Sequence, residues 1–190
     1  MDGRDVRPGG YMAVLLRFSG LVDRLSEIIG KFSGYLVLFC CLISAGNALI
    51  RYTFNLSSNG WLEIQWYLFA FIVLLGASHT LRLNEHIRVD LIYGSVSEKK
   101  RLWIDVIGLT VFLLPACTYL AWICWPFFWL SFVQGEVSSN AGGLIRWPVK
   151  LIIFAGFALL VLQGLSELVK RIAALMGLAA VDTTYEKPLQ

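Results

Sequence analysis

The run from Glu63 to Arg82 constrains this chain more than any other feature. No Asp, Glu, Lys or Arg lies between these two residues, and a helix of that length spans roughly 28 Å at 1.5 Å per residue. Because the hydrocarbon core of a bilayer is about 30 Å thick, the run predicts a membrane span with a charge at each end. The segment that follows, up to Arg101, is too polar to lie in lipid.

The composition also indicates an integral membrane protein. Hydrophobic residues make up 57% of the 190 residues and charged residues only 15%, whereas charged residues are about a quarter of a soluble domain. The net charge of +3 is small and no basic run is interleaved with aromatic residues, so we expect no nucleic-acid partner. The N-terminus lacks a signal-peptide pattern, and the first span is expected to be an uncleaved anchor.

Four charge-poor runs predict four transmembrane helices, so the expected fold class is all-α integral membrane. The expected spans cover residues 32–52, 63–81, 102–132 and 148–168. The third run is long, and Pro115 and Pro126 are its expected bending points because proline removes a backbone hydrogen bond. Small residues such as Gly76 and Gly156 allow close helix approach, which predicts a packed bundle in one domain of residues 11–175.

Two further segments flank the spans. Residues 1–10 are expected to be disordered, and residues 176–190 to form a polar tail. Between Val14 and Phe32, apolar residues recur with a helical period while Arg17 and Arg24 lie on the other side. This pattern predicts an amphipathic helix in the membrane interface, and a solvated lead-in to the first span is the alternative.

Basic residues are unequally distributed between the two sides of the membrane. All but three of the sixteen Lys and Arg residues fall before the first span, between the second and third, or after the fourth. Because Lys and Arg accumulate in cytoplasmic loops, both termini and the central loop are expected in the cytoplasm. The three residues on the opposite side are Arg51, Arg146 and Lys150.

The spans contain few side chains that could act in catalysis, ion coupling or metal binding. None carries a charged residue near its middle, where a transporter that couples to ions by itself usually keeps one. His79 and His86 belong to one helix and its exit, so they cannot hold a haem between two spans. We therefore predict no catalytic residue, no substrate-binding residue, no metal site and no cofactor. The four cysteines all lie in apolar runs, where thiols pack as small apolar side chains: Cys40, Cys41, Cys117 and Cys124.

Several residues around the second span match a known family. Glu63 opens the span, and Arg51 lies across a short turn from it, where the two are placed to form an ion pair. The matching residues are Glu63, Trp66 and Tyr67, then Leu75-Gly76-Ala77, then Leu81-Arg82, and finally Glu85-His86-Ile87-Arg88-Val89-Asp90-Leu91. With this pattern the chain resembles the small membrane subunit (DctQ-like, or Q subunit) of tripartite ATP-independent periplasmic (TRAP) transporters, over about residues 20–175.

The resemblance implies a role that depends on partners. In that family a periplasmic binding protein captures an organic acid, and a large DctM-like membrane subunit holds the substrate and sodium sites. The small subunit packs on the static scaffold of the large one. By resemblance, the chain is a non-enzymatic, lipid-embedded scaffold subunit of sodium-coupled uptake in the bacterial inner membrane. Its expected motif or partner-interface residues are Arg51, Glu63, Trp66, Gly76, Arg82, Glu85, His86, Arg88 and Asp90.

A four-span membrane redox protein is the alternative function. A quinone-linked thiol oxidoreductase needs reactive cysteine pairs in outer loops, and residues 53–60 and 136–150 contain no cysteine. A haem-anchoring respiratory subunit would show a haem absorption band after purification. The residues alone leave open both a thiol oxidoreductase and a haem-anchoring subunit.

Overall fold

The computed structural model describes residues 10–56, 58–85 and 96–178. Its elements are α1 (Gly10–Phe54), α2 (Asn59–Leu83), α4 (Glu98–Ile107), the π-helical η1 (Gly108–Leu113), α5 (Leu114–Gln134) and α6 (Trp147–Leu175). Four helical stretches are long and apolar enough to cross a membrane, with α4, η1 and α5 forming one of them. These stretches contain the four predicted spans, so the all-α membrane fold is confirmed.

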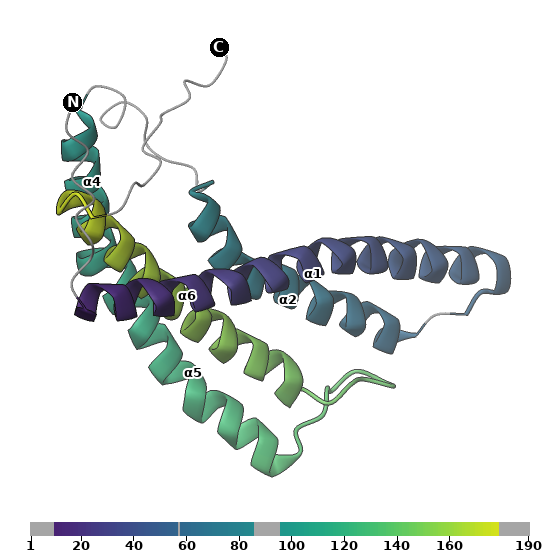
Figure 1. The fold of residues 1–190 in the computed structure, drawn as a ribbon. Helices are drawn as coiled ribbons and strands as arrows, with labels where there is room; N and C mark the ends of the chain where they lie inside the picture. Colours follow the sequence, from purple (N-terminus) through teal and green to yellow (C-terminus); the bar gives the residue numbers. More distant parts are fainter. Residues whose placement is uncertain (1–9, 57, 86–95, 179–190) are drawn as a thin grey trace.

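The helices form two hairpins that diverge from a common region (Figure 1). α1 packs along α2, α5 packs along α6, and α6 contacts both α2 and α1. Within the described residues, α5 makes no comparable contact with α1 or α2. The predicted packing between helices is therefore present, in an open arrangement in which α6 contacts every other helical stretch.

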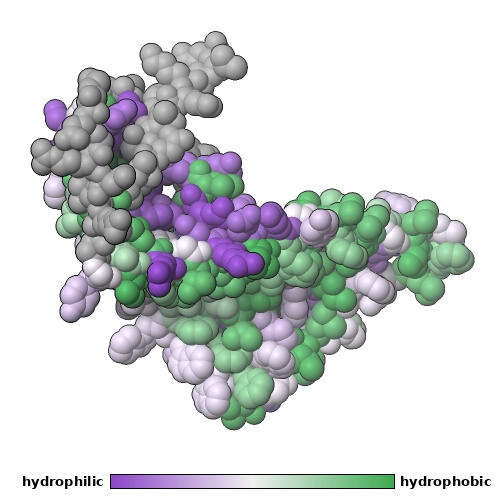
Figure 2. Space-filling view, in the orientation of Figure 1, coloured by the Kyte–Doolittle hydropathy of each residue, from purple (hydrophilic) through white to green (hydrophobic). Residues whose placement is uncertain are grey.

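An open arrangement is stable in a bilayer because lipid tails are as apolar as the side chains they contact. Figure 2 shows hydrophobic residues over much of both hairpins, while hydrophilic residues gather where the hairpins meet. Large apolar side chains such as Leu38, Leu42 and Phe69 are correspondingly exposed. Packing between the helices, rather than a central apolar core, has to hold this fold together.

α1 is one unbroken helix of 45 residues, about 67 Å long at 1.5 Å per residue. It joins the predicted amphipathic segment to the first span. The first half of α1 has an exposed apolar face with Leu21 and Leu25, an exposed charged face with Arg24, and a buried face with Ser19 and Ser26. The helix is thus present, and its position in the membrane interface stays a prediction.

The third stretch changes direction between α4 and α5 (Figure 1). Ser97 occupies the N-cap position of α4, and η1 ends two residues before Pro115. Because Pro115 has no N–H, the regular α-helical pattern is interrupted, and Leu114 donates to the Leu109 carbonyl five residues back. The irregularity expected at Pro115 is therefore a π-helical turn, whereas α5 continues through Pro126.

Two glycines let α6 approach its neighbours closely. A Cβ on Gly156 would lie 2.7 Å from the Leu74 Cβ and 3.0 Å from the Leu74 carbonyl oxygen. A Cβ on Gly164 would lie 2.8 Å from the Leu113 Cδ2. These approaches bring the backbone of α6 against α2 and against η1, which maximises van der Waals contact in the absence of a hydrophobic driving force.

Replacing Gly156 with alanine is expected to lower thermal stability. The new methyl group collides with the backbone of Leu74, and overpacking of this kind costs about 1–3 kcal/mol, so Tm in detergent should fall by roughly 3–10 °C. Gly46→Ala is the control, because a Cβ there meets nothing within 4 Å and alanine favours the helix. An equal Tm for both variants would contradict the close approach of α2 and α6.

Candidate functional site

The carboxylate of Glu63 joins the loop between α5 and α6 to the first turns of α2. It accepts hydrogen bonds from the Ser138 hydroxyl, from Asn140 Nδ2 at 2.9 Å and from the Leu144 backbone N–H at 2.7 Å. Only 4% of Glu63 is exposed, so these donors replace the water that a carboxylate otherwise needs. Glu63, Ser138, Asn140 and Leu144 are called the outer clasp below.

Further contacts hold the same loop on α2. The Tyr67 hydroxyl donates to the Ile145 carbonyl at 2.9 Å, and Asn59 Nδ2 donates to the Ala141 carbonyl at 3.2 Å. An isolated antiparallel bridge between Val137 and Ile145 closes the loop on itself. The loop that connects one hairpin is therefore fastened to the other.

The structure does not form the expected ion pair between Arg51 and Glu63. Arg51 is exposed near the end of α1, while the Glu63 carboxylate is bound by loop donors. A backbone N–H and an amide satisfy the carboxylate without ordering a long arginine side chain, which makes them the better partners. Trp66, in the next turn of α2, is 63% exposed.

Glu136 lies at the base of the loop and contacts the start of α6. The Lys150 ammonium donates to the Glu136 carboxylate and lies 4.0 Å from the centre of the Phe127 ring. The hydrogen bond from Lys150 holds the pKa of Glu136 below its usual value. Because this pKa is lowered in the folded state, the contact stabilises the loop at neutral pH and is lost as the pH falls through the lowered value.

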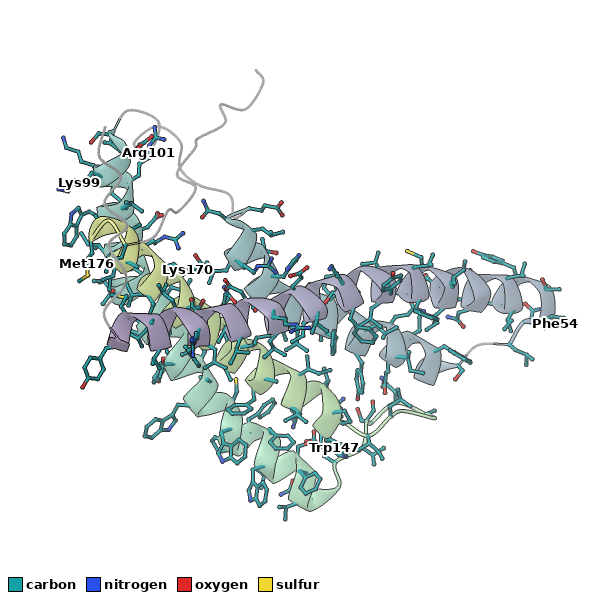
Figure 3. All side chains as sticks on the ribbon, viewed as in Figure 1. Phe54, Lys99, Arg101, Trp147, Lys170 and Met176 are labelled. Atoms are coloured by element: carbon teal, nitrogen blue, oxygen red, sulfur yellow. The ribbon has the colours of Figure 1, made fainter. Side chains whose placement is uncertain are left out.

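A second group of polar contacts ties α1 to α6 where the hairpins meet. The Gln163 side chain is fully buried: its Oε1 accepts from Ser26 at 2.7 Å, and its Nε2 donates to Asp23 at 2.8 Å and to Glu167 at 3.0 Å. Lys170 Nζ lies 2.9 Å from Asp23 Oδ2 and 2.5 Å from Glu167 Oε1. Figure 3 shows Lys170 on α6 in this region.

Arg171 extends these contacts to the third stretch. Its Nε donates to Asp105 Oδ2 of α4 at 2.9 Å, and its Nη1 donates to Glu167. The hydroxyls of Ser19 and Ser166, 2.5 Å apart, add a neutral contact between α1 and α6. These residues are called the inner polar network: Ser19, Asp23, Ser26, Asp105, Gln163, Ser166, Glu167, Lys170 and Arg171.

The charges of the inner polar network balance one another in a buried place. Glu167 and Arg171 are each 4% exposed, and an unpaired ion at such a position costs several kcal/mol. Lys170 and Arg171 are shared among the carboxylates of Asp23, Asp105 and Glu167. Because each carboxylate comes from a different element, the network fixes how α1, α4 and α6 cross.

One of the predicted site residues, Arg82, borders this network. Arg82 Nη1 lies 3.2 Å from the Asp23 carbonyl oxygen and 3.3 Å from Glu27 Oε2, so it ties the end of α2 to α1. Glu85 is exposed just after α2. Three other predicted residues lie outside the described residues: His86, Arg88 and Asp90.

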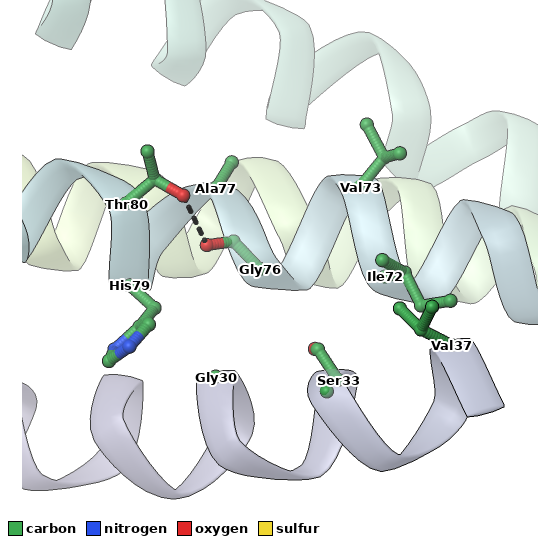
Figure 4. Close-up of a pocket in the computed structure, with 10 residues that line it drawn as sticks. Gly30, Ser33, Val37, Ile72, Val73, Gly76, Ala77, His79 and Thr80 are labelled. Atoms are coloured by element: carbon green, nitrogen blue, oxygen red, sulfur yellow. Dashed lines mark hydrogen bonds between the residues drawn. The ribbon is translucent and has the colours of Figure 1, made fainter. Parts of the chain in front are cut away.

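A groove of about 410 Å³ runs between α1 and α2 and is lined largely by small residues (Figure 4). Gly76 faces Ser33 across it, with the Ser33 Oγ 3.8 Å from the place of a Cβ. The His79 ring lies over Gly30, where a Cβ would be 2.2 Å from the ring. His79 is therefore a packing residue, and its Nδ1 is buried without a hydrogen-bond partner among the described residues.

The sequence analysis missed the inner polar network. Asp23 and Asp105 were given no role there. One signal was present in α1, because small or polar residues recur every seven positions and meet α6 first and α2 further along, the spacing of a helix packing seam. These residues are Ser19, Ser26, Ser33, Cys40 and Asn47.

The geometry defines a class of protein: a multi-pass helical membrane protein whose polar side chains tie its helices at two ends and leave the spans uncharged. The model of one protein family matches residues 40–174, and its description is "Tripartite ATP-independent periplasmic transporters, DctQ component". The match covers more than half of the chain, so the chain belongs to the DctQ family of TRAP transporter components.

Family membership confirms the resemblance found in the sequence. The DctQ family is a transporter component and not a known enzyme family, which favours transport over the redox alternative. No curated protein and no solved structure matches the chain. The substrate and the ion that drives transport therefore have to be argued separately.

Changing Glu63 to glutamine is expected to release the outer loop from α2. The amide keeps the size of the carboxylate but puts an NH2 group in place of one oxygen, so that either the Leu144 N–H or the Ser138 and Asn140 donors lose their acceptor. Amide hydrogen exchange in residues 136–145 should rise by about tenfold. Arg51→Gln is the control, because Arg51 is exposed near the end of α1 and takes no part in the clasp, so the exchange of Asn140 and Leu144 should stay near that of the parent. Unchanged exchange in the Glu63 variant would show that the clasp does not hold the loop.

Changing Asp23 to alanine is expected to loosen α1 from α6. The variant loses contacts with Gln163, Ser166 and Lys170, which removes about 2 kcal/mol of stability and lowers Tm by roughly 4–8 °C. Glu27→Ala is the matched control one turn further along α1, because Glu27 pairs on the more exposed side. A Tm loss of the same size in the control would rule out a special role for the network.

Proposed function

We propose that this chain is the small scaffold subunit of a TRAP transporter in the bacterial inner membrane. In this role it supports a large DctM-like subunit during sodium-coupled uptake of an organic acid or similar small solute delivered by a periplasmic binding protein. Family membership supports the transport role. The observation that carries the scaffold role is the placement of the polar contacts, which hold the helices to one another at both ends.

The spans themselves offer no charged group for ion coupling. The charged residues of the inner polar network on α6 lie beyond its charge-free part, and the outer clasp lies at the opposite end of α2. A charge in the hydrocarbon centre costs about 2.5–3.5 kcal/mol on insertion scales and is kept there for function. A chain without one is suited to bracing a partner that does carry the sites. The charge-free runs are 32–50, 64–81, 106–135 and 151–166.

The partner contact is proposed for residues that the helix ties leave exposed. Trp66 and Glu85 are exposed at opposite ends of α2, and Arg88 and Asp90 follow Glu85 in the sequence. We further propose that the first half of α1 lies along the cytoplasmic membrane surface, since it exposes an apolar face beside a charged face.

Reconstitution tests this function directly. Proteoliposomes containing this chain, the large subunit and the binding protein are expected to accumulate an organic acid when a sodium gradient is imposed. Liposomes that lack this chain should transport poorly, and liposomes with this chain and the binding protein alone should not transport. Uptake by this chain without the large subunit would overturn the scaffold role, and a haem absorption band in the purified chain would favour the redox alternative.

A further inference from the structure

Arg171 contacts three separate parts of the chain with one guanidinium group. Its Nε donates to Asp105 Oδ2 in α4 at 2.9 Å, and its Nη2 donates to Asn84 Oδ1 at the end of α2 at 3.4 Å. Its Nη1 donates to Glu167 in its own helix. Asn84 and Asp105 lie on either side of residues 86–95, the segment that carries most of the Glu85 to Leu91 motif.

We propose that Arg171 is a positioning residue that sets the spacing between the end of α2 and the start of the third stretch. It thereby holds Asn84 and Asp105, which flank residues 86–95 in the sequence, at a fixed separation. That this segment meets the large subunit rests on the function proposed above. The positioning role of Arg171 does not, because it concerns only contacts within this chain.

The end of α2 is shaped so that Asn84 is presented to Arg171. Asn84 adopts the left-handed conformation, with φ 62°, at the C-cap of α2. The Glu85 N–H donates to the Thr80 carbonyl at 3.1 Å, which closes the helix end in a Schellman-type turn. Asparagine tolerates this conformation better than most residues, so one residue ends the helix through its backbone and offers a side-chain acceptor to the guanidinium.

α4 depends on α6 for its position. Among the described elements it packs mainly against α6 and continues into η1, and Arg171 binds it through Asp105. Arg171 is 4% exposed, so solvent screens these contacts little. Moving α4 along α6 would leave a buried cation without its full set of acceptors.

The planar guanidinium suits this task, and a lysine does not. An arginine presents donors in fixed directions, whereas an ammonium is a point charge that cannot reach partners on two sides with the same geometry. Lys170, the adjacent residue in the same network, shows what an ammonium group contacts at nearly the same place. Lys170 binds Asp23 and Glu167 and therefore ties α1 to α6 without contacting the ends of the central segment.

Hydrogen exchange in the full chain, purified in detergent and again with the large subunit, tests the role of Arg171. Arg171→Lys keeps the positive charge but removes the planar guanidinium with its fixed donor directions. Amide exchange in residues 80–85 and 96–105 should then rise by about tenfold. Exchange in residues 19–26 of α1 should stay within about twofold of the parent. Lys170→Arg is the matched control and should leave residues 80–85 and 96–105 unchanged.

Two results would overturn the positioning role. One is unchanged exchange at residues 80–85 and 96–105 in Arg171→Lys. The other is an equal rise in residues 19–26, or the same rise in Lys170→Arg, because either would mark Arg171 as one more general stabilising contact.

Recovery of the large subunit with Arg171→Lys addresses the proposed function separately. A fall of about fivefold or more in co-purification, together with faster exchange at both segment ends, supports both the positioning role and the partner role of the segment. Faster exchange with unchanged co-purification supports the positioning role and contradicts the partner role. The two proposals can therefore fail independently.

Discussion

The buried amide of Gln163, held between Ser26, Asp23 and Glu167, is the interaction on which the rest of this structure depends. Within a bilayer, apolar side chains gain nothing by leaving lipid for protein, so apolar contact alone does not select one arrangement of helices. Directed polar contacts do select one, because leaving any partner unsatisfied in a buried site is costly. The crossing of α1 over α6 follows from this amide and from Lys170 beside it.

A fold held in this way has no need of a central core. Polar contacts at one end fix α1, α4 and α6, Glu63 fastens the loop between α5 and α6 to α2, and between these ends α6 packs closely on α2 at Gly156. The exposed flanks of α1 and α2 are then available to lipid or to another membrane protein. The same placement keeps charge out of the spans, which suits a brace better than an ion carrier.

The sequence predicted the features that depend on local composition. The interval from Glu63 to Arg82 located a span, and Pro115 located the irregularity in the third stretch. Sequence also identified the family, which rests on residues clustered around the second span. Contacts between positions far apart in the sequence could not be predicted. Asp23 and Gln163 are 140 residues apart, and the residues around each give no sign that the two side chains meet. The partner of Glu63 was misjudged for the same reason, because loop donors 75 or more residues away are nearer than Arg51.

The proposed scaffold role requires this chain to stay rigid while the transporter works. Spin labels at Leu25 of α1 and Leu165 of α6, both exposed, would report the distance across the inner polar network in a cysteine-free chain within the assembled transporter. A static brace gives the same distance distribution with and without sodium, and with and without substrate-loaded binding protein. A shift of roughly 5 Å or more between these conditions, the scale of a helix moving past its neighbour, would contradict it.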